Sequence, residues 1–420
     1  MQDRRDFLKL GAAGLVGLFA NTAMADTTEI ETDFRRVKDL SEKSWKRIQK
    51  EFTIQNKLNY LNTGTMGLSP KVVRESIIQR MEFVNSTGSY SGMKHKAQER
   101  LAQMMQCNAD EIAITHNVTE GINIAAWALP LNEGDEVVLT NHEHVGNALP
   151  WLNRKRKDGI EIQVLELAPT AEECLTRLKA LITPKTKVIA VPHVTCTTGQ
   201  VLPIKEICQL AKSRGIYTLI DGAHGVGMLN LDVKDLGCDM YASCCHKWML
   251  GPKGTGVLYA NKALIEELDS LFVGGYSDTG WTISKANSEI KGLRTDSHRF
   301  FYGTQNTALY AGIISAADFM LNIGMDRVAK RIKSLNQRFV DGILSNPKFD
   351  LLTPKEQQSR GGIASFKIEG NDRLVYEDLR KEKWILRYVG ESDLHCMRVS
   401  THIYNDEGQV DDLLDKLYHA

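Results

Sequence analysis

The chain has 420 residues, of which 42% are hydrophobic and 25% are charged, with 52 basic and 52 acidic side chains. This composition is typical of a globular protein with two or three domains. A formal net charge of zero argues against nucleic acid or a membrane surface as partner and favours a small-molecule substrate. The eight cysteines are scattered without paired Cys-x-x-Cys units, so we predict neither a metal site nor a disulfide framework.

The first 25 residues have the features of an export signal. Arg4-Arg5 is followed by Phe7-Leu8-Lys9, a weakly apolar stretch over 10–20 and the small-residue sequence Ala23-Met24-Ala25. The apolar stretch is too short for a stable membrane span. The paired arginines resemble a twin-arginine (Tat) signal, although an ordinary N-terminal helix with a chance arginine pair is the alternative. We predict a Tat signal peptide at 1–25, cleaved near Ala25, with the Tat export machinery as a partner and a periplasmic location.

The rest of the chain alternates strand-like and helix-like segments. Residues 34–57 are polar and predicted to be helical, and 171–182 and 204–214 are typical amphipathic helices. Seven β-branched runs have the length and composition of strands: Glu111–Thr115, Glu136–Thr140, Glu161–Leu165, Lys187–Val194, Ile216–Asp221, Met240–Ser243 and Gly256–Ala260. Because these runs do not alternate between apolar and polar residues, they predict an α/β fold with a mostly parallel seven-stranded sheet flanked by helices.

Three strand ends carry polar residues that suit one kind of chemistry. Ligands of such sheets bind beyond the carboxyl ends of the strands. A lysine there, as at Lys247, loses hydration, which favours the neutral amine that forms a Schiff base. A carboxylate one strand away, as at Asp221, can keep a pyridine nitrogen protonated. The helix start after 111–115 offers free N–H groups and the Thr119 hydroxyl to a phosphate.

The pattern changes near residue 307, where longer helices and a smaller mixed region begin, ending in a helix over 410–418. We therefore predict a small α+β C-terminal domain over 307–420 and a large cofactor-binding domain over 68–306. The segment 26–67 is predicted to pack with the small domain.

The motifs together resemble the class V aminotransferase family of fold-type I pyridoxal-5′-phosphate (PLP) enzymes. Within it, the sequence is most similar to the isopenicillin-N-epimerase-like and cysteine-desulfurase-like branch. The likeness runs from Tyr60-Leu61-Asn62-Thr63-Gly64 to the segment 398–405, and the Asp221 and His246-Lys247 pair is its most specific part. The resemblance implies a fold-type I PLP-dependent transferase fold and PLP as cofactor.

The resemblance also assigns roles to individual residues. Those assigned to the cofactor are Lys247 as the Schiff-base lysine, Asp221 on the pyridine nitrogen, His224 near the phenolic oxygen, His144 stacked on the ring, and Val118 (backbone), Thr119 and His246 on the phosphate. Lys247, Asp221, His144 and His224 are also the candidate catalytic residues. Thr304 matches a phosphate contact supplied by a neighbouring subunit, which implies a homodimer.

Two arginines are candidates for substrate binding. Arg398 matches the arginine that binds the α-carboxylate of the substrate as a bidentate ion pair. Arg387 is a possible second anion contact near the same opening, with an ordinary surface role as the alternative.

The sequence also departs from its relatives. Cysteine desulfurases carry a reactive cysteine in a loop after an Arg-x-Gly unit, whereas the loop after Arg387 has none, which argues against persulfide chemistry. Cys244 replaces a phosphate-binding serine, with Ser243 beside it, so either residue could contact the phosphate. Cys196 stands where desulfurases tend to have an asparagine near the ring.

In the predicted reaction, the amine of an amino acid or aminoacyl group displaces Lys247 from the cofactor, and the freed lysine removes the Cα proton. The resulting carbanion leads to transamination or epimerisation, as in the tailoring of a secreted compound such as a siderophore. The alternative within this chemistry is a cysteine desulfurase or selenocysteine lyase that breaks a C–S or C–Se bond. A protein that binds PLP without turnover is the alternative from another class. No stable membrane insertion is expected.

Overall fold

The computed structural model describes residues 41–55 and 58–420. The predicted signal peptide, and the first part of the helix predicted over 34–57, lie outside these residues. Of the described part of that helix, only α2 (Glu42–Gln49) is helical. The chain then turns, and Phe52 packs against the rings of Phe319 and Tyr404. The prediction of a helix continuing through 50–55 is therefore wrong, because burying Phe52 takes the backbone out of helical geometry.

A seven-stranded sheet forms the centre of the large part of the chain. Its strands, in spatial order, are β2 (Ile112–Thr115), β8 (Gly256–Ala260), β7 (Met240–Cys244), β6 (Tyr217–Asp221), β5 (Thr186–Pro192), β3 (Glu136–Thr140) and β4 (Glu161–Leu165). In this sheet only β8 runs antiparallel to its neighbours. Nearly every residue of the strands other than β4 is buried, as expected for a sheet covered on both faces. The predicted α/β fold is confirmed.

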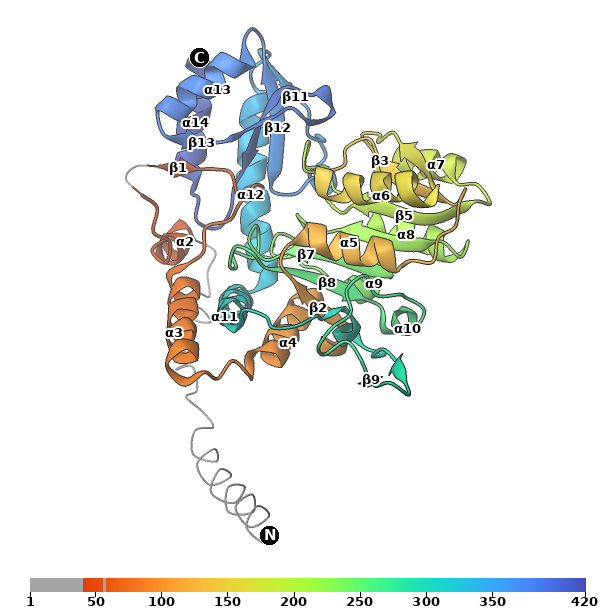
Figure 1. Cartoon of the computed structure of the whole chain (residues 1–420). Coiled ribbons are helices and arrows are strands. Elements are labelled where there is room, and N and C mark those ends of the chain that lie inside the picture. The colour runs from red at the N-terminus through yellow and green to blue at the C-terminus, as the bar shows by residue number, and fades with distance from the viewer. Residues whose placement is uncertain (1–40, 56–57) are drawn as a thin grey trace. The chain divides into compact units, whose positions relative to one another are not determined.

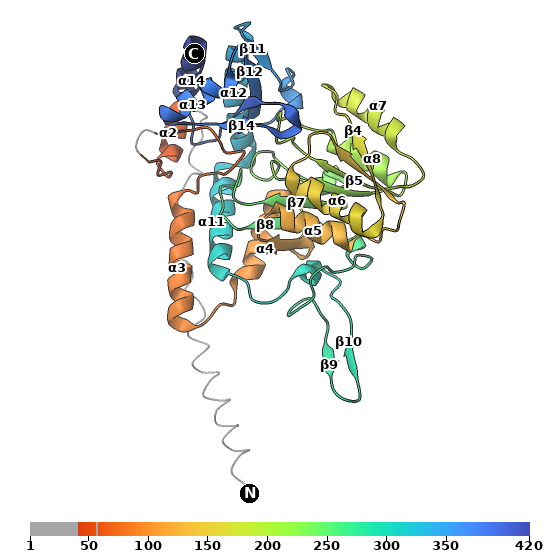
Figure 2. The ribbon, with the colours of Figure 1, turned by 45° about the horizontal axis from the view of Figure 1, so that its top comes forward.

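The helices that connect parallel strands cover both faces of this sheet. They are α5 (Val118–Ala128), α6 (Val145–Asp158), α7 (Ala171–Leu181), α8 (Ile204–Lys212) and α9 (Val233–Leu236). The crossovers through α5 and α6 move across the sheet toward β4, and the later ones move back. Because such crossovers are right-handed, this reversal places α5 and α6 on one face, as Figure 1 and Figure 2 show, and the other three on the opposite face.

A second group of helices packs beside β2 and the loop after β7. It comprises α3 (Lys71–Thr87), α4 (Met93–Met105) and α11 (Thr307–Ile323), with the short α10 (Lys262–Ile265) after β8. No single helix among the described residues is long and apolar enough to cross a membrane; α11 and α12 together pass that test by length and composition, but they meet at a bend of 79°. Most residues of α11 are buried, as in the core helix of a globular protein.

The C-terminal part of the chain is built around a four-stranded antiparallel sheet. Its elements are α12 (Met325–Leu344), β11 (Phe349–Leu351), β12 (Ile363–Ile368), α13 (Asp372–Lys381), β14 (Arg387–Val389), β15 (Cys396–Ser400) and α14 (Glu407–His419). The N-terminal strand β1 (Asn59–Tyr60) pairs in parallel with β13 (Trp384–Ile385), and Leu61 lies in the apolar core of this part. The domain boundaries at residues 67 and 306 stay predictions.

A hairpin of β9 (Trp281–Ile283) and β10 (Ser288–Ile290) extends away from the large sheet (Figure 2). The short 3₁₀ helices are η2 (Ala109–Glu111), η3 (Ser297–Phe300), η4 (Gln357–Ser359) and η5 (Glu391–Asp393).

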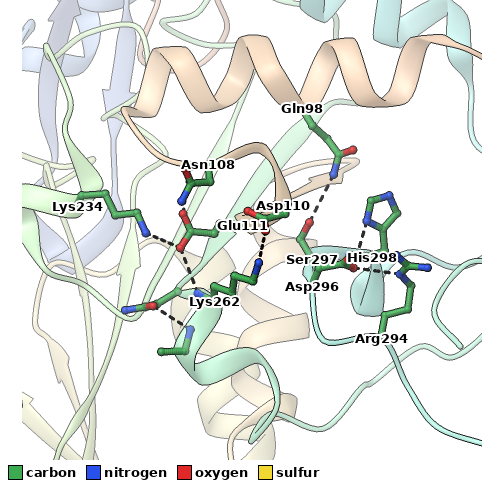
Figure 3. A network of polar contacts seen from close by, with 12 residues as sticks. Gln98, Asn108, Asp110, Glu111, Lys234, Lys262, Arg294, Asp296, Ser297 and His298 are labelled. Carbon is green, nitrogen blue, oxygen red and sulfur yellow. Dashed lines mark hydrogen bonds and ion pairs between the residues drawn. The ribbon is translucent and has the colours of Figure 1, made fainter. Parts of the chain in front are cut away.

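Polar contacts fix the start of β2, the strand that leads into α5 (Figure 3). The buried carboxylate of Glu111 is paired with Lys234 at 2.5 Å and accepts hydrogen bonds from the backbone of Asn108 and Lys262. On the other side of the strand, Ser297 Oγ donates to the carbonyl of Ile112 at 2.8 Å. These contacts anchor β2, so the position of the α5 N-terminus beyond it is well determined.

Candidate active site

The predicted site residues of the large sheet follow the carboxyl ends of its strands. Asp221 ends β6, Lys247 lies three residues after β7, and His144 ends the loop after β3 and caps α6. The three side chains are close enough for their charges to interact. Burial lowers the pKa of His144, and the nearby ammonium group of Lys247 lowers it further.

The backbone around Lys247 is fixed by tight packing. The amide of Gly67 donates to the carbonyl of His246 at 2.8 Å, and a Cβ at Gly67 would lie 1.9 Å from the carbonyl oxygen of Lys247. Trp248 is fully buried, and Leu250 adopts a left-handed conformation with φ of 61°. In the described chain, however, the ammonium group of Lys247 has no hydrogen-bond or ion-pair partner. The backbone of this loop is therefore held in one position, while the lysine amine stays available for a covalent bond.

Asp221 is a buried carboxylate with one oxygen available. Its Oδ1 accepts a hydrogen bond from the amide of Ala223 at 2.9 Å, and Oδ2 has no hydrogen bond within the described residues. Burial raises the pKa of Asp221, while the Ala223 amide, Lys247 and His144 act in the opposite direction. A protonated ring nitrogen would offer the missing donor and the compensating charge.

His224 is buried next to this carboxylate in sequence and carries an unsatisfied ring nitrogen. Its Nδ1 accepts a hydrogen bond from Trp248 Nε1 at 2.9 Å, and its Nε2 has no partner. Burial lowers the pKa of His224 well below its usual value, so the ring is neutral and carries its proton on Nε2. That N–H is suited to donate to an oxygen of a bound ligand.

The N-terminus of α5 is the predicted site for the phosphate. The side chain of Asn117 caps the helix by accepting from the amide of Glu120 at 2.9 Å, which leaves the amides of Val118 and Thr119 without intrahelical acceptors. Gly146 packs so close that its Cβ would lie 2.5 Å from Thr119 Oγ1. The buried Nδ1 of His246 also has no partner.

Thr304 does not join this predicted phosphate site within one chain. It is exposed in the turn before α11 and makes no hydrogen bond in the described chain. Its predicted contact with the phosphate of a neighbouring subunit stays a prediction.

Arg398 lies on β15, in the four-stranded sheet of the C-terminal part. Its side chain is fully buried, with Nη1 donating to the carbonyl of Cys196 at 2.6 Å and Nη2 donating to Thr65 Oγ1 at 3.0 Å. Its Nε has no partner. A guanidinium held at two points with an unpaired N–H is suited to bind a carboxylate.

These residues fit PLP. The unpaired amine of Lys247, the free oxygen of Asp221, the orphan N–H of His224 and the free amides of α5 match, in turn, the aldehyde, the pyridine nitrogen, the phenolic oxygen and the phosphate of that cofactor. Four unmet polar requirements thus correspond to four groups of one molecule.

Comparison with known proteins places the chain in a family. The family described as "Aminotransferase class-V" matches residues 81–413. The chain belongs to this family. As a class-V aminotransferase-family protein with the fold of PLP enzymes, it is an enzyme whose cofactor is PLP.

Relatives and solved structures are similar over most of the chain. Isopenicillin N epimerase of Streptomyces clavuligerus is 27% identical over 392 residues, covering 89% of this chain and 97% of the relative. A probable cysteine desulfurase of Halalkalibacterium halodurans is 32% identical over 329 residues, covering 74% and 78%. The solved structure of a C-DES mutant with glycine covalently linked to the PLP cofactor is 27% identical, covers 88% and 98%, and has a TM-score of 0.81.

The cysteines at the site are buried. Cys196 and Cys396 are 5% and 0% exposed, and burial is the main cause that raises the pKa of each thiol to about 11. Ser243 Oγ donates to the carbonyl of Gly222 at 2.6 Å, and Cys244 Sγ lies 3.6 Å from the carbonyl of Ala223. Both side chains are thus directed at the backbone after Asp221.

Arg387, the predicted second anion contact, is already paired. It lies opposite Arg398 in the β14–β15 ladder, as such a contact would, but its guanidinium forms an ion pair with Glu391.

Two residues of the site region had no distinct signal in the sequence. Thr65 contacts Arg398, and Gly67 contacts the Lys247 backbone, both from the N-terminal segment. The glycines of the Thr63-Gly64-Thr65-Met66-Gly67 stretch were the available clue, since close backbone approach is a common reason for glycine.

Proposed function

We propose that this class-V enzyme removes the Cα proton of an amino acid or aminoacyl compound and acts by epimerisation or transamination. The observation that carries the proposal is the position of Arg398 in the same site as the free amine of Lys247. Arg398 and the neighbouring Cys196 lie close to the other site residues. The charges of Lys247 and Arg398 both lower the pKa of His224, so both groups are near this histidine. A carboxylate-binding arginine beside an unpaired amine suits a substrate that carries both an amine and a carboxylate.

The residues of the chain divide the chemical work. When bound, PLP supplies an electron-withdrawing ring that stabilises negative charge at the substrate Cα. Lys247, once its amine is free, would be the base that takes the Cα proton. Asp221 would hold the ring nitrogen of the cofactor in its protonated form. Arg398 fixes the substrate carboxylate and so orients the Cα–H bond, an effect that contributes several kcal/mol in well-oriented sites.

Epimerisation and transamination differ in where the proton returns. Return to Cα from the opposite side would invert the substrate. In transamination the proton would not return to Cα; water would release a keto acid, and the amino group would stay on the cofactor. The likeness to isopenicillin N epimerase over almost its whole length supports the first outcome.

A C–S or C–Se lyase is the second candidate. It is favoured by the likeness to probable cysteine desulfurases and to the cystine C–S lyase C-DES. Against persulfide formation on the protein, the loop from Tyr388 to His395 has no cysteine. The buried thiols of Cys196 and Cys396 are poorly placed to move.

The location and the assembly belong to the same proposal. The Arg4-Arg5 motif and Ala23-Met24-Ala25 support Tat export to the periplasm, where the substrate would be a secreted compound such as a siderophore precursor. The exposed Thr304 supports a homodimer in which each subunit contributes to the phosphate site of the other. Fractionation of cells that produce the full chain, compared with an Arg4→Lys/Arg5→Lys variant, tests the location, and light scattering tests the dimer.

A panel of amino acids and aminoacyl precursors in deuterated buffer tests the reaction. Deuterium uptake at Cα with loss of optical activity indicates epimerisation, keto acid indicates transamination, and sulfide or selenide release indicates the lyase. Cofactor binding without any Cα–H exchange would support a non-catalytic PLP-binding protein and contradict the proposal. After borohydride reduction the cofactor should be fixed on the Lys247 peptide; if a Lys247→Ala variant still holds it covalently, the lysine assignment is wrong.

A further inference from the structure

The turn between β14 and β15 holds a strained backbone over the site. Ser392, Asp393 and His395 all have left-handed φ values, 55°, 52° and 44°. Each such residue costs about 1 kcal/mol or more. Side-chain contacts must therefore hold the turn in place: Ser392 Oγ donates to the carbonyl of Asn141 at 2.9 Å, and Glu391 is paired with Arg387. The turn is thereby tied to the loop that carries His144.

Two arginines lie side by side beneath this turn. Arg387 and Arg398 are directly opposite each other in the antiparallel ladder of β14 and β15. Burial lowers the pKa of Arg398 to about 10, and the positive charge of Arg387 is the next cause. Two guanidinium groups at directly opposite positions, without anions, would each attract a carboxylate.

Glu391 supplies one of those carboxylates from the protein itself. Its Oε1 is paired with Arg387 Nη2, and both side chains are more than half buried, with 30% and 26% exposure. The charge of Glu391 also acts on His144, Cys196 and Arg398, so the carboxylate faces the same site. The charge of Arg387 is thus already paired with a carboxylate before any substrate enters.

We infer that Glu391 is a specificity residue that occupies Arg387 and restricts the site to substrates with a single carboxylate near the Cα. A monocarboxylic amino acid places its carboxylate on Arg398 and meets no further charge. The second carboxylate of a dicarboxylic amino acid would approach Arg387, where it finds the arginine paired and a negative charge in place. This inference rests on the proposed function, since it names the substrate class of that site.

Spectral titrations of the holoenzyme test it. The substrates are two pairs of near-equal shape that differ in charge, L-asparagine with L-aspartate and L-glutamine with L-glutamate, added at fixed ionic strength while the absorbance of bound PLP is followed. We expect wild type to bind the amides in preference to the acids. In Glu391→Gln the ratio of acid to amide affinity should rise roughly fivefold to tenfold, because a partly buried guanidinium becomes available.

Asp393→Asn is the matched control, since it removes a carboxylate from the same turn that has no ion-pair partner within the described chain. It should leave the ratio unchanged, and adding Arg387→Ala to Glu391→Gln should abolish the gain. Circular dichroism and retained PLP verify that each variant is folded; Glu391→Ala serves as a second test if the glutamine variant is not.

An unchanged acid-to-amide ratio in folded Glu391→Gln overturns the inference while leaving the proposed function intact. The same rise in Asp393→Asn also overturns it, because the effect would then be one of general charge. If none of these four amino acids and none of the aminoacyl precursors of the deuterium-exchange panel changes the spectrum of any of these proteins, the proposed function fails, and this inference fails with it.

Discussion

Trp248 Nε1 donates a hydrogen bond to Nδ1 of His224 at 2.9 Å and thereby decides which ring nitrogen of this buried histidine carries the proton. With Nδ1 acting as acceptor, the neutral ring keeps its proton on Nε2, which has no partner. The indole is itself fixed, because Trp248 is fully buried and its backbone carbonyl lies 2.9 Å from His402 Nε2. The residue that follows Lys247 thus sets the hydrogen-bonding character of His224, the predicted contact to the phenolic oxygen of the cofactor.

Trp248→Phe should therefore weaken cofactor binding without removing the ring contact itself. The indole donor is lost, the His224 ring can take the other tautomer, and a buried donor becomes a buried acceptor. The cost of such a mismatch, about 1–3 kcal/mol, corresponds to roughly a tenfold to hundredfold lower PLP affinity. Equilibrium dialysis and the absorption maximum of bound PLP measure it. Trp281→Phe, on the exposed hairpin, is the control, and equal losses in both variants would contradict the role of the indole.

Gly67→Ala tests the packing behind Lys247. The added Cβ would lie 1.9 Å from the Lys247 carbonyl oxygen and 2.9 Å from Leu250 Cδ2, so the lysine loop must shift. Because a displacement of about 1 Å can cost a hundredfold in rate, we expect activity to fall at least tenfold while the fold persists. The yield of borohydride-fixed cofactor should fall as well.

Gly275→Ala is a suitable control for that variant, since a Cβ at this position meets nothing within 4 Å. Activity of Gly67→Ala equal to that of Gly275→Ala would show that the Lys247 loop adapts without consequence.

The sheet and the site motifs could be predicted because they are local in sequence. Each of the seven strands was placed to within two residues at either end, since buried β-branched runs bounded by turns are distinct from their surroundings. The proximity of Asp221 to Lys247 follows from two neighbouring strand ends, β6 and β7. Short local motifs, together with the rule that ligands bind beyond the carboxyl ends of parallel strands, are enough to predict this part of the site.

Contacts between distant segments could not be predicted in this way. Thr65 reaches Arg398 across 333 positions, and β1 pairs with β13, a contact that a run of two residues does not announce. The ion pair of Arg387 with Glu391 precedes a run of left-handed residues in the turn after β14, which are neither glycine nor asparagine. Local sequence patterns do not predict such a turn, so the pairing of Arg387 became clear only from the structure.

Acid should destabilise the protein through buried histidines. Burial lowers the pKa of His402 to about 3 and that of His193 to about 4. Since each folded pKa lies below the unfolded value of about 6.5, their contribution to stability is fully present above that pH and is lost as pH falls toward the folded values. Each contributes up to roughly 3 kcal/mol, which urea unfolding between pH 7.5 and pH 4.5 would measure.

His402→Gln should reduce that acid sensitivity, even though it lowers stability at pH 7.5 by disturbing the contact with Trp248. His95→Gln removes an exposed histidine on α4 and serves as control. If His402→Gln and wild type lose stability in parallel on acidification, the buried histidine is not a cause of the loss.

Glu143 should act in the opposite direction. Its carboxylate accepts hydrogen bonds from Thr140 and Asn147, but burial prevails and raises the pKa of Glu143 to about 7. Because this folded pKa lies above the unfolded value of about 4.3, the contribution of Glu143 to stability is fully present below that value and is lost as pH rises through 7. Between pH 5 and 8.5, the cofactor-free wild type should therefore lose up to roughly 3 kcal/mol relative to Glu143→Gln. Urea unfolding of both proteins across this range measures the difference, and parallel curves would mean that Glu143 titrates as an ordinary surface carboxylate.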